Sequence, residues 1–107
     1  MAKEPGCEAV CPLEEVPDTG FIVRPWGDTE VAICRTADTI HVVENRCSHA
    51  FSPFDGGRLR GHRLMCPLHG ACFDVRTGEP LGRPAVRPIR VFEVRLVNGD
   101  VHIAAGD

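Results

Sequence analysis

The chain has 107 residues, of which 43% are hydrophobic and 25% charged, so it is long enough for one small folded domain and is not expected to be disordered. Its formal net charge of −3 excludes a general nucleic-acid binder, because phosphate recognition needs a dense surface of Lys and Arg. Eleven glycines and nine prolines favour short strands and turns over long helices. We therefore expect a single all-β domain over residues 1–107.

The amino-terminal residues MAKEPGCEAV contain no apolar run of signal-peptide length, and no segment approaches the roughly 18 apolar residues of a membrane span. We expect a cytoplasmic protein that contacts no membrane. In a reducing compartment, six cysteines in so short a chain indicate metal ligation or buried thiols rather than a disulfide framework.

Charge is unevenly distributed along the chain. Residues 1–20 hold one base and five acids, whereas residues 46–95 hold nine arginines and four acids. Two interpretations of the basic middle stay open: solvated arginines on strand faces, or a patch that steers an acidic protein partner. The densest part is the segment that contains Arg58, Arg60, His62 and Arg63, and His62 is a candidate partner contact.

The first third of the chain reads as β-structure after an acidic lead punctuated by prolines. Residues 21–24 form a predicted strand, closed by Pro25 and a turn at Gly27 and Asp28. Residues 30–35 and 39–44 are rich in β-branched side chains and predict a hairpin around Ala37 and Asp38.

The last third predicts a second hairpin. Between residues 91 and 97 the pattern alternates, with Phe92, Val94 and Leu96 on one face. The pair Asn98 and Gly99 is a strong hairpin-turn signal, and residues 101–103 resume the alternation. Residues 46–88 between the two β-blocks lose periodicity, which predicts a loop insertion held by a β-scaffold. A loop of this length needs something to order it, and a metal centre would do so.

Two short motifs in the insertion offer candidate metal ligands. They are Cys47-Ser48-His49 and Cys66-Pro67-Leu68-His69, separated by sixteen residues. Structural zinc motifs tend to pair Cys with Cys and His with His, whereas each motif here offers one thiolate and one imidazole. If each motif gives its cysteine to one iron and its histidine to another, the product is a [2Fe–2S] cluster with unlike irons.

Through these two motifs, and through the stretch CPLHGACFD that begins at Cys66, the chain resembles the Rieske proteins. The resemblance implies an antiparallel β-sandwich with the cluster-binding loops at one tip. It also implies one Rieske-type [2Fe–2S] cluster with Cys47, His49, Cys66 and His69 as ligands. The competing interpretation is that these four residues bind a structural zinc or belong to the core.

The ligand types set the range of the reduction potential. Two sulfides and two thiolates balance two ferric ions, and Rieske potentials accordingly lie at roughly −150 to +300 mV. High-potential respiratory Rieske proteins place a Ser and a Tyr hydroxyl where this chain has Ala71 and Phe73, and they place a disulfide where it has Ser52 and Leu68. These departures resemble the low-potential Rieske-type ferredoxins of bacterial ring-hydroxylating oxygenases, so we expect a potential near the bottom of the range.

Several residues around the motifs have two open interpretations. Gly70 either lets backbone N–H groups approach the cluster sulfides or is a plain turn glycine. A second group either shields the cluster or belongs to the scaffold core; it consists of Phe51, Phe54, Leu68 and Phe73. The resemblance implies that Pro84 belongs to a third, proline-bearing loop that covers the cluster. The remaining thiols are expected to be free, with Cys34 buried on its strand; they are Cys7, Cys11, Cys34 and Cys72. His41 and His102 are expected to lie on strands, and Trp26 to pack.

The resemblance implies an electron carrier and not an enzyme. It would take one electron from a flavin-dependent NAD(P)H reductase and pass it to a terminal aromatic ring-hydroxylating oxygenase, as a monomer that forms transient complexes. Two other functions stay open. One is a small Rieske subunit of a nitrite reductase-type complex, and the other is a redox-inert, zinc-binding interaction module.

Overall fold

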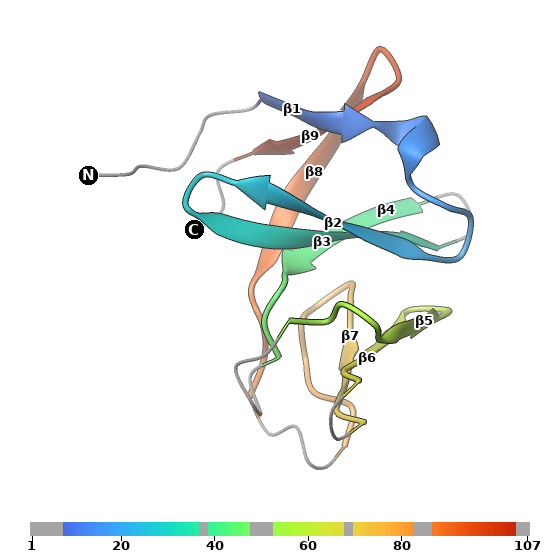
Figure 1. Ribbon diagram of the computed structural model, residues 1–107, viewed down its shortest axis with the longest axis vertical. Coiled ribbons are helices and arrows are strands. Elements are labelled where there is room, and N and C mark those ends of the chain that lie inside the picture. The colour runs from blue at the N-terminus through green and yellow to red at the C-terminus, as the bar shows by residue number, and fades with distance from the viewer. Residues whose placement is uncertain (1–7, 37–38, 48–52, 68–69, 83–86, 105–107) are drawn as a thin grey trace.

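The computed structural model describes residues 8–36, 39–47, 53–67, 70–82 and 87–104, and within these ranges the chain is built from antiparallel strands (Figure 1). The strands are β1 Glu8–Pro12, β2 Phe21–Trp26, β3 Thr29–Thr36, β4 Thr39–Glu44, β5 Arg58–Arg60, β6 Arg63–Met65, β7 Cys72–Asp74, β8 Val91–Val97 and β9 Asp100–Ala104. A short 3-10 helix, η1, spans Leu13–Glu15. The predicted all-β class is confirmed. In the described residues no helix is long and apolar enough to cross a membrane.

Six strands form one sheet in the order β1-β9-β8-β4-β3-β2, which supplies the predicted β-scaffold. Both predicted hairpins are present in it, because β3 pairs with β4 and β8 pairs with β9. The turn between β8 and β9 has Asn98 at φ 52° and Gly99 at φ 81°, the left-handed conformations that a two-residue hairpin turn requires.

Three details of the scaffold differ from the sequence prediction. The acidic lead contains β1, which pairs with β9 near the other end of the chain. Strand β2 runs through Pro25 to Trp26, because β2 is the last strand in the sheet order and the missing proline N–H breaks no inner ladder there. Leu96 is half exposed although the sequence pattern places it on the same face as buried Phe92; it lies next to the last residue pair before the β8–β9 turn.

Strand β3 is buried on both faces and therefore divides the interior into two cores. Val31 and Ile33 belong to a core that also includes Trp26, Phe92 and residues of β9. The intervening Ala32 and Cys34 face a second core on the other side of the sheet. Successive residues of a strand point to opposite faces, so this one strand joins the two packing layers.

The second core is closed by a small sheet. This sheet lies within residues 46–88, so the prediction that this segment is a loop without strands was wrong. Its three strands pair in the order β5-β6-β7 and form a separate layer at one end of the molecule (Figure 1). Leu59, Leu64 and Phe73 occupy one row across the three strands and are buried against Ala32 and Val43 of the scaffold. The layer lacks the periodic signal of the scaffold because each strand has only three residues.

Candidate metal centre

The two predicted thiolate ligands lie in the same core, at the end of the molecule that carries the small sheet. Cys47 follows β4 and is fully buried, and Cys66 directly follows β6 with 1% of its surface exposed. Both belong to the core that Phe54 and Phe73 close with an edge-to-face contact, their ring centroids 5.7 Å apart. The predicted ligands His49 and His69 lie outside the described residues, as do Ser48, Phe51, Ser52, Leu68, Pro84 and Cys7.

The backbone after Cys66 turns back toward the sheet. The Cys66 N–H donates to the carbonyl of Ala71 over 2.7 Å, and the Gly70 N–H donates to the carbonyl of Cys66 over 3.2 Å. Gly70 has φ 72°, a conformation that disfavours residues with a Cβ, which gives the local reason for a glycine. Its expected approach to the cluster sulfides stays a prediction.

The donor set and its surroundings fit an iron–sulfur cluster. Two buried thiols in one apolar core are suitable ligands for a thiolate-bound iron, and burial excludes the water that would compete for it. A cavity of about 210 Å³ opens beside Cys66, lined by Gly56, Gly57, Arg58, Met65, Cys66, Pro67 and Gly70. Ala71 and Phe73 are fully buried close to Cys66 in the chain, and neither side chain offers a hydrogen-bond donor.

Asn45 connects the scaffold to this site, and the sequence analysis missed it. Its side-chain amide donates to the carboxylates of Glu30 at 3.3 Å and Asp55 at 2.9 Å, while its carbonyl accepts from the Phe54 N–H at 2.8 Å. Asn45 is 7% exposed and lies two residues before Cys47. A buried asparagine with three bonds fixes the segments on both sides of it, but in the sequence it is one polar residue at the end of a strand.

The other thiols do not resemble ligands. Cys11, Cys34 and Cys72 are free thiols, as predicted, and all three are buried, which the sequence predicted for Cys34 alone. Burial raises the pKa of Cys34 to about 12, so this thiol stays protonated. Within the described ranges, no three side chains of His, Cys, Asp or Glu are grouped so as to hold a metal ion. A second metal site therefore has no support in that part of the chain.

A pair of histidines lies where the scaffold meets the small sheet. His41 of β4 contacts His62 of the β5–β6 turn, with ring centroids 5.7 Å apart. The pKa of His41 is lowered, chiefly by burial and secondly by the charge of His62.

Trp26 packs edge-to-face on Phe92, with ring centroids 5.0 Å apart, which confirms its predicted packing role.

Comparison with known proteins agrees with the site chemistry. Residues 7–93 match the Rieske [2Fe-2S] domain. Ferredoxin CarAc of Metapseudomonas resinovorans is 34% identical over 96 residues, which cover 89% of this chain and 90% of that protein. The anthranilate 1,2-dioxygenase ferredoxin subunit of Burkholderia cepacia is 30% identical over 94 residues, which cover 88% of this chain and 87% of that subunit.

Solved structures give the same result. The ferredoxin of carbazole 1,9a-dioxygenase from Nocardioides aromaticivorans IC177 superposes with a TM-score of 0.89 and 29% identity, covering 95% of this chain and 100% of that one. A ferredoxin solved in a complex of reduced oxygenase and oxidized ferredoxin in carbazole 1,9a-dioxygenase superposes with a TM-score of 0.83 and 31% identity, covering 91% of each chain. This chain therefore belongs to the Rieske [2Fe–2S] domain family, with one Rieske-type cluster as its cofactor.

Proposed function

We propose that this chain is the ferredoxin component of a multicomponent oxygenase system. It takes one electron from a flavin-dependent NAD(P)H reductase and delivers it to a terminal ring-hydroxylating oxygenase, and it transforms no substrate itself. The observation that carries the proposal is the pair of buried thiols, Cys47 and Cys66, in one core of a chain similar over nearly its whole length to dioxygenase ferredoxins. When bound, the cluster supplies a reversible one-electron redox step.

In this proposal Cys47 and Cys66 hold one iron, and His49 and His69 hold the other. The apolar core around the two thiols excludes water, and the bonds of Asn45 hold the segment before Cys47 in place. Ala71 and Phe73 cannot donate a hydrogen bond from their side chains to the centre. Because such bonds stabilise the reduced state, their absence supports a potential near the bottom of the Rieske range.

The proposed partners dock weakly and separate quickly, because a carrier has to exchange one partner for the other during turnover. Interfaces of electron-transfer complexes are at the small end of the size range, below about 1,200 Å². We further propose that the chain is a cytoplasmic monomer between these encounters.

The test is spectroscopic. Protein purified in air is examined by visible and electron paramagnetic resonance spectroscopy before and after dithionite, together with iron and acid-labile sulfide content. We expect two irons and two sulfides per chain, since that is the cluster stoichiometry, and a paramagnetic signal only after reduction. Voltammetry should place the potential near roughly −150 mV, and a value above roughly +100 mV would contradict the role of Ala71 and Phe73.

The same preparation tests the alternatives. A colourless protein with stoichiometric zinc would establish the redox-inert interaction module instead. A large subunit that copurifies in a one-to-one ratio and survives gel filtration would favour a fixed subunit of a nitrite reductase-type complex. Delivery of electrons from the reduced protein to an oxygenase, with release afterwards, supports the carrier.

A further inference from the structure

We propose that the outer face of the small sheet is the surface on which a redox partner with an acidic patch docks. This arginine face consists of Arg58, Arg60 and Arg63. The inference deepens the proposed function and rests on it, because it names the chemistry of the surface that the partner presents.

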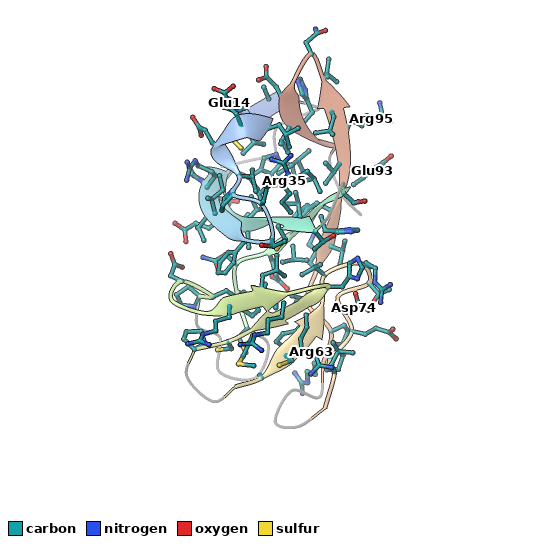
Figure 2. The ribbon with its side chains drawn as sticks, turned by 90° about the vertical axis from the view of Figure 1, so that its right-hand side faces the viewer. Glu14, Arg35, Arg63, Asp74, Glu93 and Arg95 are labelled. Atoms are coloured by element: carbon teal, nitrogen blue, oxygen red, sulfur yellow. The ribbon has the colours of Figure 1, made fainter. Side chains whose placement is uncertain are left out.

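The strand register directs these three side chains outward. Leu59 and its partner Leu64 point into the core, so their chain neighbours point to the opposite side of the sheet. All three arginines are exposed. Figure 2 shows Arg63 on the small sheet at the opposite end of the molecule from Arg95. The arginine face therefore occupies one defined end of the protein.

Within the described part of the chain, the arginine face carries a surplus of positive charge. Arg60 and Arg63 are direct cross-strand partners, and like charges in such a pair destabilise a sheet. On its other side Arg63 is the cross-strand partner of Asp74, whose carboxylate is held by Arg76. In the same described residues no carboxylate forms an ion pair with any of the three arginines, whereas Arg24 pairs with Glu15 and Arg76 with Asp74. Two exposed arginines that repel each other are suited to bind a carboxylate that another molecule supplies.

A hollow beside the face gives the partner side chains a place to bind. It has a volume of about 320 Å³ and is lined by Arg60, His62, Arg63, Asp74, Arg76 and Leu81. Asp74 does not oppose a carboxylate there as a free charge, because Arg76 binds both of its oxygens, at 3.0 and 2.8 Å. Leu81 is 42% exposed and adds an apolar contact to the basic wall.

The arginine face adjoins the proposed cluster site. Arg58 lines the cavity beside Cys66, and Arg63 precedes Cys66 by three residues on the strand that leads to it. A partner held on this face is therefore close to the centre with which it exchanges an electron. The whole chain carries a net charge of −3, so an acidic partner is repelled by the remainder of the surface and is oriented toward this end.

The experiment compares charge reversal on the arginine face with charge reversal at the other end. Dithionite-reduced holoprotein is mixed in a stopped-flow instrument with plastocyanin, an acidic one-electron acceptor, or with cytochrome c, a basic one. The variants are Arg63→Glu and Arg95→Glu. Arg95 is a matched control because it is an exposed strand residue whose contact with Glu93 is long, at 3.7 Å. Arg60→Gln provides a milder second change on the same face.

We expect Arg63→Glu to lower the rate constant with plastocyanin by about ten-fold at low ionic strength and to raise the rate constant with cytochrome c. Arg95→Glu should change either rate by less than about two-fold, and the difference should disappear in high salt. If Arg63→Glu and Arg95→Glu changed the rates equally, the docking proposal would be wrong while the proposed function would stand. A wild-type protein without a Rieske spectrum would overturn the proposed function and this inference together.

Discussion

The scaffold sheet and the small sheet differ in how they are stabilised. Scaffold strands have five to eight residues and pair mostly through consecutive hairpins, so local periodicity and turn residues specify them. The strands of the small sheet have three residues each, and their inner row is buried only because the scaffold covers it. The comparison teaches that the end carrying the proposed cluster ligands depends on packing from elsewhere, whereas most strand pairs of the scaffold are specified by local signals.

Two buried cysteines, one from each region, give the largest expected contrast. Cys66→Ala removes a proposed iron ligand at the small sheet, and we expect the purified variant to contain no cluster. Cys34→Ala removes an equally buried thiol from β3, and we expect it to keep the cluster while the free energy of unfolding falls by about 1 kcal/mol, from the small cavity.

Iron and sulfide content, the visible spectrum and urea unfolding measure both effects. Stoichiometric iron in Cys66→Ala would contradict the ligand assignment. Loss of iron in Cys34→Ala with the fold retained would show that the scaffold thiol is itself a ligand.

Glycines in the two regions give the next contrast, which is one of stability. A methyl group on Gly57 would collide with the backbone carbonyl of Met65 and come within 2.9 Å of the carbonyl of Phe54. Backbone atoms cannot move aside cheaply, so we expect Gly57→Ala to lower the free energy of unfolding by about 3 kcal/mol.

Gly99→Ala is the matched change in the scaffold. Gly99 has a positive φ, but a methyl group there meets nothing within 4 Å among the described atoms, so the expected loss is about 1 kcal/mol. Urea denaturation of both variants gives the comparison, and equal losses would mean that the packing around Gly57 is not tight.

Asn45 tests the connection between the two regions. Asn45→Ala leaves the buried N–H of Phe54 without its acceptor, and we expect the free energy of unfolding to fall by about 2 kcal/mol. Iron should also be lost faster to a chelator, because the segment before Cys47 is then less well held. Asn45→Asp keeps the acceptor for Phe54 but places a third carboxylate beside those of Glu30 and Asp55, so it should recover none of the loss. An Asn45→Ala protein that retains iron as long as the wild type would refute the positioning role.

The smallest expected effect is a pH dependence at the boundary between the two sheets. The pKa of His41 is lowered by burial first and by His62 second; Arg76 also lowers it, and Asp74 opposes the shift. The unfolded chain therefore binds a proton at this position more readily than the folded one does. The neutral form of His41 therefore stabilises the folded protein at pH values above the ordinary histidine pKa of about 6.5. This contribution is lost as the pH falls below that value toward the lowered pKa of the folded state.

His41→Gln removes this contribution. Urea midpoints at pH 7.5 and 5.5 should differ by less in the variant than in the wild type. An identical pH slope in both proteins would show that His41 does not couple the two sheets to pH.

The amino-acid sequence by itself determined the elements whose signals are local. Alternating apolar residues and the Asn98-Gly99 turn predicted the second hairpin, and the two Cys-His motifs predicted the ligand types, because these features lie within a few residues of one another. Tertiary structure decided the rest. Pairing of β1 with β9, burial of both faces of β3, the bonds of Asn45 and the packing of the small sheet against the scaffold all join segments that are separated in the chain. Such contacts form only when the whole chain closes around its two cores, so no short stretch of sequence records them.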